Sequence, residues 1–342
     1  MDIGPLYNRI EIVDNSESTS PINMYSFPKE WKTIEKDKNK KLIENSIKTN
    51  YLSFTQEILD DSHLELIGAA TNLTNLSIYD CVTLNNKLFF LLYLTNLTHL
   101  ELSFSNIDDS DLICLKYLTN LQSLVMIHNK INGSGFSDYI LPSLKYIKLY
   151  GGSVSIGTIT DICRSAPNLT EFDYSYDEGK CFNNQCLEYV CSNLKLVDLV
   201  LAYVNITDYS SLANCLTLTS LVLLNPDVTD YTFLAKCLSL KEISIHPEYQ
   251  IFNVFFPLLP DLESLSTCEI VFDTIYDSIS SFTSLQKLDI ITNNSNLSNI
   301  AHMTKLTELH AKYKNMTNVV DLSYLSKLVN LVNLDLRYAV LC

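Results

Sequence analysis

Apolar residues alternate with other residues in short stretches along most of the chain, and the alternation returns every 21 to 27 residues. Each stretch resembles the pattern LxxLxLxxNxL, and thirteen such units can be anchored on its first position. The anchors are Thr49, Leu73, Leu97, Leu121, Leu144, Leu169, Leu196, Leu218, Leu240, Leu262, Leu285, Leu306 and Leu331. At the fourth and sixth positions of all units, only Thr267 is plainly polar. Because residues two apart share one side of a strand, each unit predicts a short strand with one apolar side.

Two neighbouring units near the middle of the chain repeat each other at an offset of 22 residues. Residues 206–215 (ITDYSSLANC) correspond to residues 228–237 (VTDYTFLAKC). A single short strand cannot bury its apolar side, whereas parallel copies stacked side by side can. The repeat therefore predicts a solenoid with one continuous core, in which the leucines are the stacking frame and the variable positions are surface.

The most regular part of the repeat is residues 94–124 (LTNLTHLELSFSNIDDSDLICLKYLTNLQSL). It resembles the leucine-rich repeat superfamily, and is most similar to the short repeats of internalins and of phosphatase regulators. The resemblance covers residues 49–342 and implies a curved α/β solenoid, with a parallel sheet on the concave side and short helices or 3-10 turns on the convex side. The pattern is incomplete, since Val204 and Pro226 replace the asparagine of the ninth position. The acids Asp109, Asp208 and Asp230 are expected to cap the convex segments.

Residues 1–48 precede the repeat and form a separate N-terminal segment. After Pro28, the pattern predicts a helix over residues 28–48 whose apolar side includes Trp31, Ile34 and Leu42. A solenoid needs a cap over its first unit, so this helix is interpreted as that cap. The start of the chain has no signal-peptide pattern, and no apolar stretch approaches 18 residues. We therefore expect a cytoplasmic or nuclear protein whose ten cysteines are reduced.

The net charge of −15 lies entirely on residues 49–342, because residues 1–48 contain eight basic and eight acidic side chains. Such a surface disfavours direct contact with nucleic acid or anionic membranes. It favours a protein partner that carries a basic patch.

The chain shows no motif that predicts catalysis or a cofactor. It has only eight glycines, with no phosphate-binding loop, and no HExxH, GxSxG or CxxC spacing. Cys181, Cys186 and Cys191 lack a nearby fourth ligand, so we interpret them as small buried residues and not as a zinc site. The sequence therefore predicts a protein that is not an enzyme.

The third, fifth, seventh and eighth positions of each unit are expected to form the concave surface. The middle units place tyrosines, acids and apolar residues there, a mixture typical of binding surfaces, although β-propensity alone also favours tyrosine and valine. The predicted partner-binding residues are Tyr146, Tyr150, Glu171, Asp173, Tyr176, Asp198, Tyr203, Val222 and Leu224. The three acids of this set are predicted to lack basic neighbours. In the C-terminal units, Lys287, Lys312 and Arg337 are expected to offset Asp289, Glu308 and Asp335.

Two further features suggest contacts. The unit anchored on Leu169 is the longest, and its extra residues after Asp177 predict a loop beside the concave face. The last strand, near Leu334 and Leu336, is predicted to leave an open edge that is either simply charged or covered by a partner or a second copy.

Together these observations predict a non-catalytic interaction scaffold that binds a basic or mixed protein surface through its concave face. A substrate receptor of a ubiquitin ligase, or a pathogen or viral effector, is one alternative. An architectural subunit of a large assembly is another.

Overall fold

The structure is a computed structural model of the 342-residue chain. It describes residues 50–338, apart from residues 58, 82–86, 152–154, 177–180, 225, 227, 229, 247–258, 268–275, 293 and 314–319. The predicted capping helix with Trp31, the loop after Asp177, and Leu341 and Cys342 lie outside the described residues. Within the described residues, no helix is long and apolar enough to cross a membrane.

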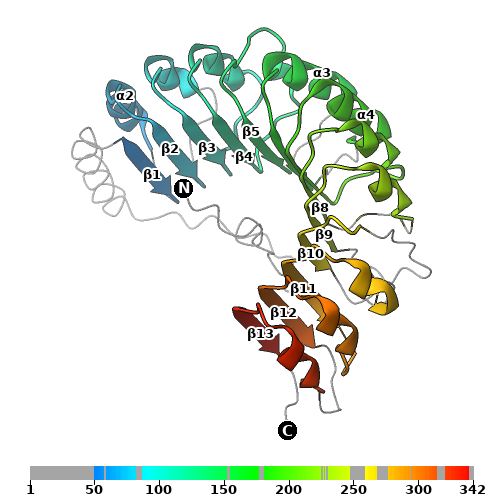
Figure 1. The fold of residues 1–342 in the computed structure, drawn as a ribbon. Helices are drawn as coiled ribbons and strands as arrows, with labels where there is room; N and C mark the ends of the chain where they lie inside the picture. The colour runs from blue at the N-terminus through cyan, green and yellow to red at the C-terminus, as the bar shows by residue number, and fades with distance from the viewer. Residues whose placement is uncertain are drawn as a thin grey trace, which may run out of the picture.

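The strands form one parallel sheet in which each strand pairs with the next along the chain (Figure 1). This arrangement confirms the predicted one strand per unit, including the weakly patterned first unit. The strands are β1 (Tyr51–Thr55), β2 (Asn75–Tyr79), β3 (His99–Ser103), β4 (Ser123–Ile127), β5 (Tyr146–Tyr150), β6 (Glu171–Ser175), β7 (Asp198–Ala202), β8 (Ser220–Leu224), β9 (Glu242–His246), β10 (Ser264–Thr267), β11 (Lys287–Thr292), β12 (Glu308–Tyr313) and β13 (Asn333–Arg337).

The sheet lines the inner side of an arc, and short helical segments cover its outer side (Figure 1). This architecture is the curved α/β solenoid that the repeat predicts. The convex segments are α2 (Asp61–Ala69), η2 (Leu88–Tyr93), η3 (Asp111–Tyr117), η4 (Ser134–Phe136), α3 (Ile156–Ser165), α4 (Asn184–Asn193), η5 (Ser210–Asn214), η6 (Thr232–Lys236), η7 (Tyr276–Ser281), η8 (Ser298–His302) and η9 (Ser323–Lys327), where α marks an α-helix and η a 3-10 helix.

A capping side chain distinguishes the convex segments that are α-helices, and Asp60 supplies it for α2. The ten-residue helices α3 and α4 lie in long units of 25 and 27 residues, although the unit anchored on Leu306 also has 25 residues and forms η9. Ser155 caps α3, and the Asn183 side chain accepts hydrogen bonds from the first turn of α4. Most shorter units have fewer residues between their strands and form a 3-10 turn. A 3-10 turn spans more distance per residue than an α-helix does.

The predicted capping role holds for two of the three acids within their own unit. Asp208 accepts a hydrogen bond from the Ser210 N–H at 2.8 Å, and Asp230 accepts one from the Thr232 N–H at 2.8 Å. Asp109 caps the start of η4 in the following unit and not η3 of its own unit. Its neighbour Asp108 accepts the bond from the Ser110 N–H, whereas the Asp109 carboxylate points into the following unit.

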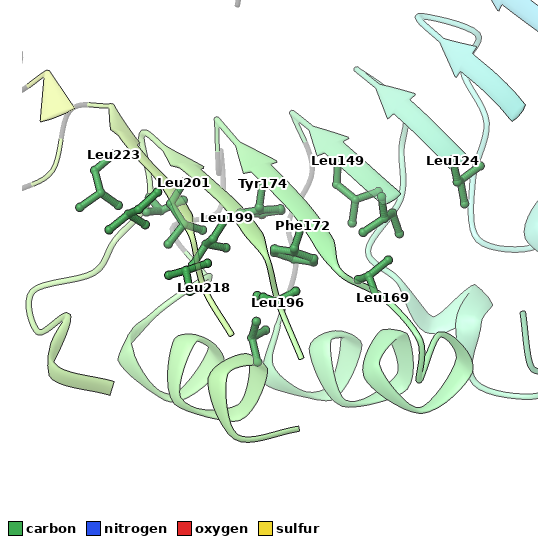
Figure 2. Close-up of a cluster of buried hydrophobic side chains, with 14 of the residues drawn as sticks. Leu124, Leu149, Leu169, Phe172, Tyr174, Leu196, Leu199, Leu201, Leu218 and Leu223 are labelled. Carbon is green, nitrogen blue, oxygen red and sulfur yellow. The ribbon is translucent and has the colours of Figure 1, made fainter. Parts of the chain in front are cut away.

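The core lies between the sheet and the convex segments, where side chains from successive strands stack in rows (Figure 2). At the fourth and sixth positions, every residue of β1–β12 is buried. Thr267, the polar exception, satisfies its hydroxyl by donating to the Ile245 carbonyl at 3.2 Å. Cys186 and Cys191 are also buried, which agrees with their interpretation as small core residues, whereas Cys181 is only half-buried.

Candidate binding surface

The sheet brings most of the predicted partner-binding residues into three adjacent rows on the concave side. Tyr146, Glu171 and Asp198 are register neighbours on β5, β6 and β7. Asp173 and Val222 belong to the row of fifth positions, separated by one strand. Tyr150, Tyr176, Tyr203 and Leu224 lie at the carboxyl ends of β5–β8.

Exposure separates these residues into two groups. Tyr146, Tyr150, Glu171, Tyr176, Asp198, Tyr203 and Leu224 are half-buried, so part of each side chain remains open. Asp173 and Val222 are only 6% and 1% exposed. The concave side is the shorter side of a curved sheet, so small side chains at the middle of its strands are crowded by their neighbours.

The expectation that Asp173 lacks a basic neighbour is wrong. Lys148 is its register partner on β5, and the Lys148 ammonium lies 3.1 Å from the Asp173 carboxylate. Ser175 also donates to the carboxylate at 3.1 Å. Both partners of the ion pair are largely buried, so the charge of Asp173 is neutralised locally and is not presented to a partner.

A continuous stack of aromatic rings runs along the carboxyl ends of β2–β7. We call it the aromatic ladder, and its members in order are Tyr79, Phe104, His128, Tyr150, Tyr176 and Tyr203. Successive ring centroids are 5.1, 4.6, 4.6, 4.5 and 4.2 Å apart. These spacings match the distance between neighbouring strands, so each strand contributes one ring. Aromatic pairs at such distances each stabilise a structure by about 0.5–1.5 kcal/mol beyond simple burial.

The backbone at the eighth position explains why these rings align. Phe104, His128, Tyr176 and Tyr203 have φ values of 52°, 48°, 56° and 55°, in the left-handed region that large side chains rarely adopt. In this conformation the Tyr176 N–H donates to the Ala202 carbonyl at 2.9 Å, and Phe104, His128 and Tyr203 make the same contact with the next strand. The strand pairing thus continues one residue further and holds the rings in line.

Only half of the ladder is among the predicted partner-binding residues. Tyr150, Tyr176 and Tyr203 belong to that set, whereas Tyr79, Phe104 and His128 do not. At the eighth position, four consecutive units carry Phe104, His128, Gly151 and Tyr176. Because glycine has no ring, the sequence does not indicate a continuous row of aromatic residues. Tyr150 fills the gap from the seventh position.

One ladder tyrosine has a perturbed pKa. Burial, with a smaller contribution from the neighbouring Tyr176, raises the pKa of Tyr150 above its ordinary range. The exposed fraction of Phe104 is 39%, and His128 is also exposed, so the ladder offers both ring edges and hydroxyl groups to a ligand.

The C-terminal units show the charge compensation that the sequence predicts. Lys287 lies 3.3 Å from Glu308, and Arg337 lies 2.7 Å from Asp335. Asp289 has His310 as its nearest partner at 3.8 Å, whereas the Lys312 ammonium lies over the ring of Tyr338. Each of these three acids thus has a basic side chain nearby, although the neighbour of Asp289 is His310 and not Lys312.

No family model matches the chain, and no curated protein matches it. Among solved structures, it is similar to an internalin from Listeria monocytogenes, with 16% identity over 94% of each chain and a TM-score of 0.45. It is also similar to a leucine-rich repeat protein from Leptospira interrogans, with 19% identity over 85% of this chain and 72% of that chain and a TM-score of 0.49. The thirteen-stranded parallel sheet with one strand per leucine-framed unit defines a repeat solenoid. The chain therefore has the leucine-rich repeat fold.

Proposed function

We propose that this protein is a binding scaffold without catalysis of its own, and that the concave side over β3–β8 holds a protein partner with a basic or mixed surface. The observation that carries the proposal is that the aromatic ladder, at the carboxyl ends of the strands, shares the concave side with acids at the strand starts. Tyrosines are enriched among the residues that dominate binding energy at interfaces. Here they are already stacked, so binding would immobilise few additional side chains.

Charge supports the same surface. Glu171 and Asp198 lie side by side at the starts of β6 and β7, at the opposite ends of these strands from the ladder, and Glu101 lies at the middle of β3. Lys148 is the only lysine or arginine at the concave positions of described β2–β8, and it is bound to Asp173. A basic partner would therefore be attracted to this part of the arc, mainly through a faster association rate.

The test compares three forms of the chain as bait in an extract of the cells that express it, with captured proteins quantified by mass spectrometry. The concave variant is Glu171→Lys with Asp198→Lys; Asp173 is left unchanged because it holds Lys148. The matched control is Glu65→Lys with Glu188→Lys, which makes the same charge change at exposed positions of α2 and α4.

We expect a partner that wild type and control capture equally and that the concave variant captures about tenfold less, which corresponds to about 1.4 kcal/mol. Raising the ionic strength should weaken capture by wild type as well. Circular dichroism of all three forms checks that the fold is unchanged. Equal capture by the concave variant would place the binding surface elsewhere and contradict the proposal.

A further inference from the structure

The last strand of the sheet presents core residues to solvent. The exposed fraction of Leu334 is 45%, whereas Leu309 and Leu288, at the same position of the two preceding strands, are 0% and 1% exposed. Leu331 and Leu336 are half-buried, although their equivalents in the units that contain β2–β12 are buried. Val332, beside them, is 80% exposed. In the described chain, no strand or helix covers this end of the arc (Figure 1).

The backbone of β13 also has an unpaired side. The Asn333 N–H donates to the Thr307 carbonyl on β12 at 3.0 Å. Since peptide groups alternate in direction along a strand, those of Leu334 and Leu336 point away from β12. Exposed edges of this kind are commonly protected by a charge that points at the edge. Here Asp335 and Arg337 lie on the concave side and pair with each other at 2.7 Å, so they do not block it.

We propose that two copies of the chain pair through β13, antiparallel, around a two-fold axis at Leu336. Such an axis runs perpendicular to the sheet, so it keeps both concave sides facing the same way and joins the two apolar ends. Leu336 then lies opposite Leu336 of the second copy, and their outward peptide groups can exchange two hydrogen bonds. This pairing involves only copies of this chain. It does not depend on the proposed binding of a partner by the concave side.

Charge selects this register over its nearest alternative. With the axis at Leu336, Asp335 lies opposite Arg337 of the second copy, and the pairing occurs twice by symmetry. With the axis at Asp335, two carboxylates would face each other, which is destabilising across a strand pair. An axis between two residues would set core positions against concave positions, so the alternation of the strand excludes it. Asp335 and Arg337, which pair with each other within one copy, can thus pair instead with Arg337 and Asp335 of the second copy.

The test is a charge-swap series with the full 342-residue chain, in which light scattering after size exclusion gives the mass at several concentrations. We expect wild type to be a dimer at high concentration. Asp335→Arg and Arg337→Asp should each be monomeric, because each sets like charges against each other. Mixing these two variants should restore a dimer, since each supplies what the other lacks. Glu242→Arg, the same charge change on β9, should remain dimeric.

Each result decides the proposal. If the wild type is a monomer at every concentration, the proposal is wrong, whatever covers β13. A dimer that survives both single swaps would show that copies meet at another surface. Failure of the mixed variants to associate, when wild type does, would exclude the Leu336 register. Circular dichroism of each variant separates loss of pairing from loss of fold.

Discussion

Gly151 lies directly against the imidazole of His128. A β-carbon at Gly151 would be 2.6 Å from the Nδ1 atom of His128, far inside a normal contact. Gly151 also has a φ of 72°, at the position where neighbouring units place a large aromatic residue. The missing side chain leaves room for Tyr150 to enter the stack between His128 and Tyr176, so the continuity of the aromatic ladder depends on this glycine.

Gly151→Ala should therefore destabilise the protein. The left-handed backbone costs a residue with a β-carbon about 1–2 kcal/mol, and displacement of the His128 ring adds to this. We expect a loss of about 2 kcal/mol in urea unfolding followed by circular dichroism. The near-ultraviolet spectrum should change as well, because the tyrosines of the ladder move.

The matched control for this prediction is Gly157→Ala in the first turn of α3. A β-carbon there meets only the Ser155 hydroxyl, at an ordinary 3.6 Å. Alanine is the better helix former, so this variant should be neutral or slightly more stable. If both alanines had the same effect, the close approach at Gly151 would not govern stability.

The fold could be predicted from the sequence because it depends on a local rule repeated many times. Each unit places apolar residues at two alternating positions, and Leu199 and Leu201 illustrate how both become core. The α-helices are recognised less by unit length than by the capping residues Asp60, Ser155 and Asn183, which the sequence also contains. The N-terminal segment, including Trp31, has no repeat to constrain it, and its predicted cap remains a prediction.

The candidate site was harder to predict because it depends on how neighbouring strands align. Lys148 and Asp173 occupy the same position of successive units, so their ion pair could have been predicted from the register alone. The ladder could not, because it combines the seventh position at Tyr79 and Tyr150 with the eighth position elsewhere. Only the left-handed backbone at the strand ends brings the two positions into one stack.

The Asp109 carboxylate connects two successive units, which leads to a second prediction. It accepts hydrogen bonds from the N–H groups of Asn132 at 2.8 Å, Gly133 at 2.7 Å and Gly135 at 3.0 Å. Asp109→Ala leaves these donors without a partner from the protein, and we expect a loss of about 2 kcal/mol in urea unfolding. Hydrogen exchange should accelerate at residues 132–135.

The comparison for Asp109 is Asp208→Ala. Asp208 caps only its own turn through the Ser210 N–H, so its removal should cost less and leave the following unit protected. A uniform rise in exchange over the whole arc for Asp109→Ala would argue against a local clamp between two units.

A third prediction concerns acid. Burial lowers the pKa of His246 to about 4, and its Nε2 atom lies 3.0 Å from the Ser266 hydroxyl. An unfolded histidine titrates near 6.5, so the unfolded chain takes up this proton first. The stability contributed by neutral His246 is thus complete above pH 6.5 and declines as the pH falls towards 4.

His246→Gln should remove this part of the pH dependence, because glutamine keeps a polar group near Ser266 but does not titrate. The measurement is the melting temperature of both forms between pH 7 and pH 4, with His302→Gln as a control at an exposed site. Nuclear magnetic resonance of the wild type should show the His246 ring neutral at pH 5. A ring that is charged at pH 6 would contradict the prediction.

The final prediction tests the alternation on which the repeat rests, at two successive residues of β7. Leu201 is 1% exposed and lies in the core between Tyr174 and Leu223 (Figure 2), whereas Val200 is half-buried on the concave side. Leu201→Asn removes a packed side chain and buries an amide, so it should cost about 3–5 kcal/mol. Val200→Asn should cost less than about 1 kcal/mol. Because each unit contacts only its neighbours, exchange protection in the Leu201 variant should fall first in β6 and β8. Similar losses for the two variants, measured by urea unfolding, would show that the two sides of β7 are not distinct.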